Sequence, residues 1–483
     1  MPEEPQAASF RDPAGRLFLV DGRVLRLVHA SARAGLEEFL VSTPARELVT
    51  RGLLISSRVL DDGQRSALAQ DAAALELMAP VPDAALVEHE RIEFPSYPYE
   101  WPPEMLHAAA TLTLDLALEL LEHGWGLKDA TPYNVLFRGA DPVFVDVLSI
   151  ERRDAANPTW LPYAQFVRTF LLPLLAAQRF GLPLDHIFLG RRDGLESEDL
   201  YRMCGPLQRF LPPVFSLVSM PTWLGTRANP DDASLYRQEL LPDAEKARYI
   251  LRSLLNRLRR QLKRLTPKPG RSSAWSDYLS TSNYSHEHFA AKHSFVEQAL
   301  NEHRPARVLD VGANTGYFSR LAAQSGARVV AIDYDPVVVG DVWRAARADR
   351  LTILPLVVNL ARPSPATGWR NRECPAFLDR AREAFDAVLM LAVVHHMLVT
   401  ERVPLEEIVD VAAELTRDLL IVEYVDPADS MFRRLLRGRE ELHRDFNPQR
   451  FEQAFRRRFQ IVRSARLPEA TRTLYLMRKG QGL

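Results

Sequence analysis

Five nearly continuous apolar runs in the second half of the chain constrain its fold more than any other feature. They are ARVLDVG (306–312), ARVVAID (327–333), LTILPLVVNL (351–360), FDAVLMLAVVHH (385–396) and DLLIVEYVD (418–426). Segments with helical spacing, such as 317–325 and 405–416, separate several of these runs. Strands that are apolar on both faces and joined by crossovers are typical of a parallel sheet covered by helices on both sides. The pattern therefore predicts an α/β fold.

Two further β-rich runs end the chain, FQIVRSARL (459–467) and TRTLYLMR (471–478). They suit an antiparallel hairpin on the sheet edge, which gives a Rossmann-like sheet of seven strands. A basic stretch with proline and serine, KRLTPKPGRSS (263–273), follows a helical segment with a leucine stripe at 246–265. We predict an α+β N-terminal domain (1–262), a linker (263–283) and a C-terminal domain (284–483).

The overall charge is nearly balanced, with 61 basic and 62 acidic side chains and a net charge of −1. This balance gives no electrostatic argument for nucleic acid or an anionic membrane as a partner. Two cysteines exclude a disulfide framework and a four-cysteine zinc site. The polar N-terminus lacks an apolar signal region, and the apolar run 387–394 is too short to span a bilayer. We expect a cytoplasmic protein and leave its oligomeric state open.

The sharpest motif is VLDVGANTGYF (308–318), where the first apolar run turns into a helical segment. Its glycines allow a tight bend and a close approach to a ligand, and Asp310 lies at the carboxyl end of the strand, where open α/β sheets bind ligands. A dinucleotide-binding turn has the spacing G-x-G-x-x-G, whereas this turn has D-x-G-x-N-x-G. The difference favours a positively charged amino-acid nucleoside over a pyrophosphate.

A second carboxylate supports this interpretation. Asp333 ends the next apolar run, 23 positions after Asp310, where an acidic residue is placed to accept hydrogen bonds from ribose hydroxyls. Either aspartate alone can equally be a loop or cap residue. Both of them, in register with five strands, predict a nucleoside site.

The segment VLDVGANTGYFS (308–319) resembles motif I of class I methyltransferases that depend on S-adenosylmethionine (SAM), and VVAIDYD (329–335) resembles their second motif. The resemblance implies SAM as the cofactor and a set of binding residues. It places Asp310, Gly312, Asn314 and Gly316 around the methionine part, Asp333 at the ribose and Asn359 near the adenine, and it adds Tyr334 and Leu391 to the cofactor-binding set. Asn359 is equally well explained as a residue that starts a turn.

His395 and His396 follow the fourth strand, where this fold commonly places substrate and methyl-transfer residues. A histidine there can take a proton from the nucleophile, position the cofactor, or have only a structural role. Glu423 and Tyr424, at the end of the fifth strand, are weaker candidates. No further ligands accompany the two histidines, so we expect no metal. Tyr284, Lys292 and the block 359–369 are assigned to the entrance.

The N-terminal half carries a second constellation, LKDATPYN (127–134) followed by PVFVD (142–146). Asp129, Asn134 and Asp146 have the spacing of the catalytic and metal-binding loops of protein-kinase-like phosphotransferases. The pattern departs from that family, because Leu127 replaces a histidine and no glycine-rich loop is present. Arg23 or Arg26 stands where a lysine is expected. A kinase-like fold with a degenerate, substrate-holding or scaffold role is predicted, and an active ATP-dependent phosphotransferase is the alternative.

The order of several blocks across the chain also resembles the NoeA-like nodulation proteins and related bacterial methyltransferases. These blocks include SFRDPAG, SYPYEW, LKDATPYN, NLARPSPATGW and VVHHM. The resemblance implies a methyltransferase acting on a small-molecule or glycan-type acceptor. A non-catalytic protein that binds SAM is a further alternative. The aromatic segment FPSYPYEW (94–101) is interpreted as a packing element, with a hinge or a substrate surface as alternatives.

Overall fold

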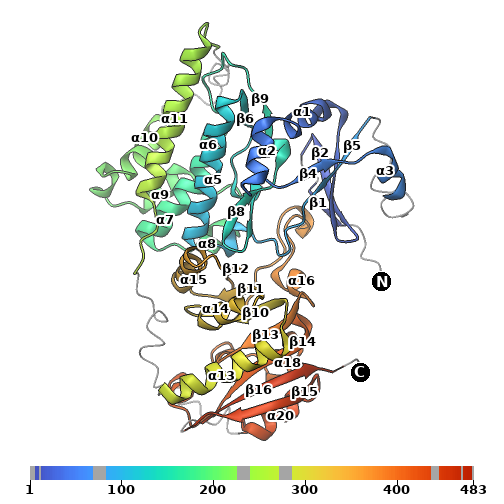
Figure 1. The fold of residues 1–483 in the computed structure, drawn as a ribbon. Helices are drawn as coiled ribbons and strands as arrows, with labels where there is room; N and C mark the ends of the chain where they lie inside the picture. Colours follow the sequence, from blue (N-terminus) through green and yellow to red (C-terminus); the bar gives the residue numbers. More distant parts are fainter. Residues whose placement is uncertain are drawn as a thin grey trace.

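The computed structural model describes residues 6–9, 12–68, 83–225, 240–270, 286–436, 445–468 and 471–480. An N-terminal part with one small sheet and many helices lies against a C-terminal part built around a larger sheet (Figure 1). Within the described ranges, no helix is long and apolar enough to cross a membrane.

The N-terminal part begins with a five-stranded antiparallel sheet in the order β1-β2-β3-β5-β4. Its strands are β1 (Gln6–Ser9), β2 (Gly15–Val20), β3 (Arg23–Val28), β4 (Ser57–Val59) and β5 (Ala85–His89). The turn between β2 and β3 places Asp21 and Gly22 in the left-handed region. Helices α1 (Ala30–Leu40), α2 (Thr43–Thr50) and α3 (Asp62–Leu68) lie between strands β3 and β5 in the chain.

A helical layer completes the N-terminal part and is centred on α5 (Pro103–Glu122), twelve of whose residues are buried. Helix α11 (Ala244–Arg264) packs along α5, and Leu251, Leu255, Leu258 and Leu262 are its buried leucines. The spacing of these leucines in the sequence predicts this stripe. The remaining elements are β6 (Trp125–Leu127), β7 (Val135–Arg138), β8 (Asp141–Phe144), β9 (Ile150–Arg152), α6 (Tyr163–Phe166), α7 (Leu172–Phe180), α8 (Leu184–Phe188), α9 (Ser197–Met203) and α10 (Met220–Gly225).

The C-terminal part is a seven-stranded sheet in the order β12-β11-β10-β13-β14-β16-β15. Its strands are β10 (Arg307–Val311), β11 (Arg328–Asp333), β12 (Ile353–Val357), β13 (Phe385–Met390), β14 (Thr416–Val425), β15 (Phe459–Arg466) and β16 (Arg472–Lys479). Strands β10 to β14 pair in parallel, and β16 and β15 pair antiparallel at the edge. The predicted five parallel strands and terminal hairpin are therefore confirmed.

Helices cover both faces of this sheet. They are α13 (His286–His303), α14 (Tyr317–Gln324), α15 (Pro336–Ala348), α16 (Phe377–Ala381), α17 (Val394–Val399), α18 (Leu405–Leu415), α19 (Ser430–Leu436) and α20 (Pro448–Phe455). Because β10 lies between β11 and β13, the chain reverses direction across the sheet at β10. Open α/β sheets bind ligands at such a switch point, beyond the carboxyl ends of the strands.

The two parts meet through a buried contact at the aromatic segment 94–101. Glu100 is fully buried and pairs with Arg380 of α16. The guanidinium of Arg380 also lies over the rings of Phe94, Tyr97 and Phe377, at 5.1–5.6 Å from their centroids. The segment is therefore a packing element of the contact between the two parts. A second contact joins α15 to α5, where Arg344 pairs with Glu104. Trp343 Nε1 of α15 also donates to the carbonyl of Ala140, between β7 and β8, at 3.0 Å.

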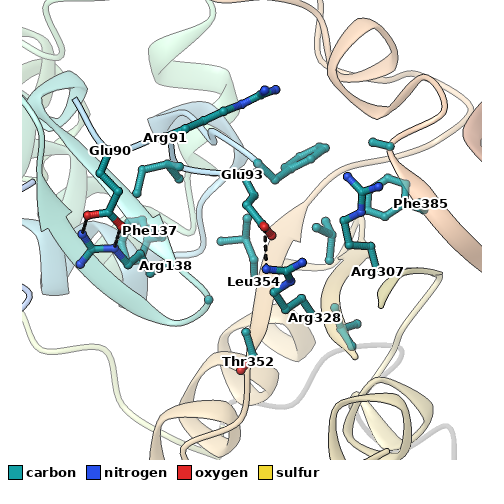
Figure 2. A pocket seen from close by; sticks show the side chains of 16 residues that line it. Glu90, Arg91, Glu93, Phe137, Arg138, Arg307, Arg328, Thr352, Leu354 and Phe385 are labelled. Carbon is teal, nitrogen blue, oxygen red and sulfur yellow. Dashed lines mark hydrogen bonds and ion pairs between the residues drawn. The ribbon is translucent and has the colours of Figure 1, made fainter. Parts of the chain in front are cut away.

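A cavity of about 490 Å³ lies beside this contact (Figure 2). Arg307 and Arg328, the first residues of β10 and β11, line its C-terminal side. Glu90 and Glu93 line its N-terminal side, and an ion pair of 2.6 Å joins Glu93 to Arg328 across the gap. The cavity is therefore at the amino ends of the strands, on the opposite edge of the sheet from Asp310 and the glycine turn.

Candidate active site

The turn after β10 has a backbone that only certain residues adopt readily. Gly312, Asn314 and Gly316 have φ values of 68°, 50° and 75°, all in the left-handed region. The amides of Gly312 and Ala313 both donate to the Ile332 carbonyl, at 2.8 and 3.0 Å, which ties the turn to β11. A Cβ on Gly312 would lie 2.6 Å from Val393 Cγ2. Glycine is required at this position both for the backbone angle and for the close packing.

Asp310 is buried beneath this turn, with 2% of its surface exposed. The Ser319 hydroxyl of α14 donates to its carboxylate at 2.6 Å. Burial raises the pKa of Asp310 to about 7, although Ser319 and the nearby Lys292 ammonium partly oppose the shift. Asp310 therefore carries a carboxyl group whose charge changes close to neutral pH.

This shift predicts a pH-dependent stability. The folded protein favours the protonated form of the Asp310 carboxyl. The stabilising contribution of this carboxyl is therefore fully present below the unfolded pKa of 3.8, and it is lost as pH rises through about 7. The stability difference between wild type and Asp310→Asn should fall by up to about 1.4 kcal/mol per pH unit in that window. Urea unfolding of both proteins from pH 4 to pH 8 measures the difference. A difference that does not vary with pH would contradict the assignment.

Asp333, at the end of β11, lies next to the same turn. Its carboxylate accepts hydrogen bonds from the amides of Asn314 at 2.9 Å and Asp335 at 3.1 Å. Burial raises the pKa of Asp333, and these amides oppose the shift. The following residue, Tyr334, is half exposed. The parallel pairing of β10 with β11 thus places both predicted aspartates at one edge of the sheet.

Asn359 and Leu391 follow the neighbouring strands β12 and β13. The Asn359 side chain accepts a hydrogen bond from the Ala361 amide at 2.9 Å, so it starts a turn. Its Nδ2 lies 3.5 Å from Glu401. Leu391 is buried, and Ala392 after it has a φ of 58°.

His395 and His396 are side by side in α17, with ring centroids 4.2 Å apart. His395 is 1% exposed, stacks on Phe432 of α19, and has no hydrogen-bond partner at either ring nitrogen among the described residues. Burial lowers the pKa of His395 well below its ordinary value and that of His396 to about 4. Both rings are consequently neutral at physiological pH, the form that can accept a proton.

A buried network of four charges lies close to these histidines, and sequence reasoning missed it. Lys292 of α13 pairs with Glu423 of β14 at 2.6 Å, and Glu423 pairs with Arg472 of β16 at 3.3 Å. Arg472 also pairs with Asp429 at 2.9 Å. Burial disfavours the charged form of Glu423, but Lys292 and Arg472 outweigh it and lower its pKa. The positive charges of Lys292 and Arg472 also help to keep His395 neutral.

The assignment of Lys292 to an entrance is wrong, because its side chain is buried and held by Glu423. Tyr284 lies outside the described residues. The only sequence signal for the network was Glu423, an acidic residue inside an apolar strand run. Buried carboxylates need a partner, so its position alone implied that a cation lies near it.

In the N-terminal part, the fold brings Asn134 and Asp146 together through Ser149. Asn134 Nδ2 donates to Ser149 Oγ at 3.1 Å, and this hydroxyl donates to Asp146 at 2.5 Å. Arg26 of β3 donates to the other Asp146 oxygen at 2.6 Å. Arg23, the other candidate, pairs with Glu88 instead. A guanidinium and a hydroxyl therefore already engage the carboxylate that holds magnesium in protein kinases.

Asp129 stands apart from this group. It accepts a long hydrogen bond of 3.4 Å from Gln165, and burial raises its pKa. In the part of the chain that the structure describes, no three His, Cys, Asp or Glu side chains are grouped as a metal site.

Comparison with known proteins gives the class of the C-terminal part. The family model described as a methyltransferase domain matches residues 251–462. The N-methyltransferase NodS from Bradyrhizobium japonicum WM9, solved with S-adenosyl-L-homocysteine, is 13% identical, covers 44% of this chain and 94% of its own, and has a TM-score of 0.32. The bifunctional kinase-methyltransferase WbdD is 17% identical, covers 42% of each chain, and has a TM-score of 0.30.

The switch-point turn, the paired aspartates and the matching family model define a SAM-dependent methyltransferase with a Rossmann-like sheet. The nodulation protein NoeA of Rhizobium meliloti (strain 1021) is 31% identical over 480 residues, covering 98% of this chain and 96% of that protein. The chain therefore belongs to the NoeA family.

Proposed function

We propose that this methyltransferase acts on a small-molecule or glycan-type acceptor that reaches the carboxyl ends of β10 and β13. The observation that carries the proposal is the geometry of the turn 312–316, which is tied to β11 and flanked by Asp310 and Asp333. Two carboxylates suit a sulfonium cation, and the turn offers no lysine or arginine for a pyrophosphate. The site chemistry therefore fits SAM, which supplies an electrophilic methyl group when bound.

Each residue of the site has a proposed task. Asp333 accepts hydrogen bonds from the ribose, and the backbone of Gly312, Asn314 and Gly316 passes close to the methionine part. Tyr334, Asn359 and Leu391 complete the proposed cofactor-binding set. Most of the rate is expected from holding the acceptor nucleophile in line with the methyl group.

His395 is the proposed proton acceptor, with His396 beside it. Its ring is neutral and buried, and neither ring nitrogen has a hydrogen-bond partner among the described residues. The buried network of Lys292, Glu423, Arg472 and Asp429 would hold the surrounding elements in place, because it ties α13 to two strands of the sheet.

The kinase-like assignment of the N-terminal part also remains a proposal. We propose a domain of residues 1–262, a linker of 263–283 and a methyltransferase domain of 284–483. The ion pair between Arg26 and Asp146 supports a scaffold or substrate-holding role over phosphate transfer, since it engages the carboxylate that magnesium would need.

Methyl transfer can be tested without knowing the acceptor. The full chain is incubated with labelled SAM and a small-molecule extract, and products that gain one CH2 are sought by mass spectrometry. Wild type should form a labelled product, whereas Asp333→Ala should lose at least about tenfold in SAM affinity, the equivalent of about 1.4 kcal/mol. Calorimetry measures the affinity of both proteins.

The role of His395 is tested separately, by the rate of product formation. His395→Asn should bind SAM as wild type does but should slow product formation about 100-fold, within the range of general base catalysis. His29→Asn, a change far away in the N-terminal part, is the matched control. Equal rates for His395→Asn and wild type would remove the general-base assignment while leaving the cofactor site intact.

A further inference from the structure

Between β12 and α16 the chain leaves the C-terminal sheet, and we call its residues 359–374 the interdomain segment. Val357, the last residue of β12, is the register partner of Asp333. The interdomain segment therefore begins at the carboxyl edge of the sheet, next to the aspartate proposed to bind the ribose. The end near α16 lies against the N-terminal part (Figure 1).

The first end of the interdomain segment is attached to the helix that carries both candidate histidines. Arg362 Nη2 donates to the two carboxylate oxygens of Glu401, at 2.9 and 3.0 Å. The Glu401 amide in turn donates to the His396 carbonyl at 3.2 Å. A displacement of this end would therefore pull on α17, which holds His395 and His396.

The second end is attached to the N-terminal part. Arg192, between α8 and α9, pairs with Glu373, whose side chain is only 6% exposed. The Arg192 guanidinium also lies 4.6 Å from the centroid of the Tyr133 ring, in the block 127–134. Ser364 donates to the buried carboxylate of Glu100. A buried carboxylate needs a partner, so Arg192 fixes where Glu373 lies.

The backbone between these ends is strained. Gly368, Arg370 and Asn371 have φ values of 86°, 55° and 56°, all in the left-handed region. Residues other than glycine keep such angles only where the surrounding structure holds them. The conformation of the interdomain segment therefore depends on its contacts, and several of those contacts come from the N-terminal part.

We propose that the N-terminal part positions the acceptor site of the methyltransferase through the interdomain segment, with Arg192 as the positioning residue. The proposal rests on the proposed methyl transfer and gives the N-terminal part a task in that reaction. It requires no phosphate transfer. Arg192 touches neither cofactor nor acceptor and acts through Glu373, the interdomain segment and α17.

Hydrogen exchange followed by mass spectrometry tests this coupling in the full chain without an acceptor. In Arg192→Gln, peptides from 359–374 and from 395–401 should exchange at least about tenfold faster than in wild type. Peptides from β10 should be unchanged. Faster exchange in 359–374 together with wild-type rates in 395–401 would overturn the proposal, because the loss of Arg192 would then be purely local.

The rate of methyl transfer gives a second readout. With labelled SAM and a dilution series of the small-molecule extract, Arg192→Gln should raise the half-saturating amount of extract at least about fivefold. Its SAM affinity should equal that of wild type. Arg192→Lys, which keeps a positive charge beside Glu373, should recover most of the loss. An unchanged half-saturating amount in Arg192→Gln would also contradict the proposal.

The matched control is Arg191→Gln. Arg191 precedes Arg192 and pairs with Asp199 inside the N-terminal part, so its loss leaves the interdomain segment held. This variant should match wild type in hydrogen exchange of 359–374 and in methyl transfer. Wild type that methylates nothing in the extract would contradict the proposed function, and hydrogen exchange would still decide the role of Arg192.

Discussion

Gly312→Arg is expected to abolish SAM binding, with a loss of affinity of more than about 100-fold, or about 2.7 kcal/mol. An L-residue at its φ of 68° is strained by roughly 1–2 kcal/mol. Its Cβ would also lie 2.6 Å from Val393 Cγ2, so the turn or the segment after β13 must move. Both segments border the proposed cofactor site. Calorimetric titration of SAM into wild type and variant measures the effect.

Gly326→Arg provides the matched control. Gly326 follows α14, has a φ of 97°, and has no atom within 4 Å of the position where a Cβ would lie. It carries the backbone strain of the first variant without its collision and lies outside the proposed site. The control should therefore bind SAM nearly as wild type does. Equal affinities for wild type and a folded Gly312→Arg protein would show that the cofactor binds elsewhere.

Arg380→Met is expected to lower the free energy of unfolding by about 3–5 kcal/mol, the usual cost of leaving a buried charge without its partner. Glu100 would stay fully buried and would keep hydrogen bonds only from the Ser364 hydroxyl and the Tyr97 amide, neither of which is charged. The Pro95 carbonyl would also lose the Arg380 guanidinium, which donates to it at 2.5 Å. Because these groups join the two parts, the C-terminal part should lose its contact with the N-terminal part first. Urea unfolding and limited proteolysis measure the two effects.

A neighbouring arginine, Arg382, provides the matched control for Arg380→Met. Arg382→Met, two positions away, breaks an ion pair with Glu414 in which both side chains are about half exposed. Exposed pairs contribute only about 0–1 kcal/mol, so this control should stay close to wild type. If both variants unfold alike, the contact between the two parts does not depend on the buried pair. The double variant Glu100→Gln, Arg380→Met should recover part of the loss, because it leaves no uncompensated charge.

Local patterns in the sequence predicted the C-terminal sheet and the position of its site. Each buried parallel strand is an apolar run, so the number and direction of the strands can be read from the chain itself. The turn 312–316 and Asp333 follow directly from strand ends, and parallel strands bring their carboxyl ends to one edge. The leucine stripe of α11 was predictable for the same reason, since helical spacing is a local property.

Contacts between distant residues could not be predicted this way. Lys292 meets Glu423 across 131 positions, and Arg380 meets Pro95 across 285.

The sequence by itself determined the strands, the glycine turn and the two aspartates, because short-range sterics and apolar periodicity act within a few residues. Only the tertiary structure decided which arginine engages Asp146, which cations neutralise Glu423, and which apolar side chains stay exposed. Those outcomes depend on burial, and burial exists only after segments far apart in the chain have packed together.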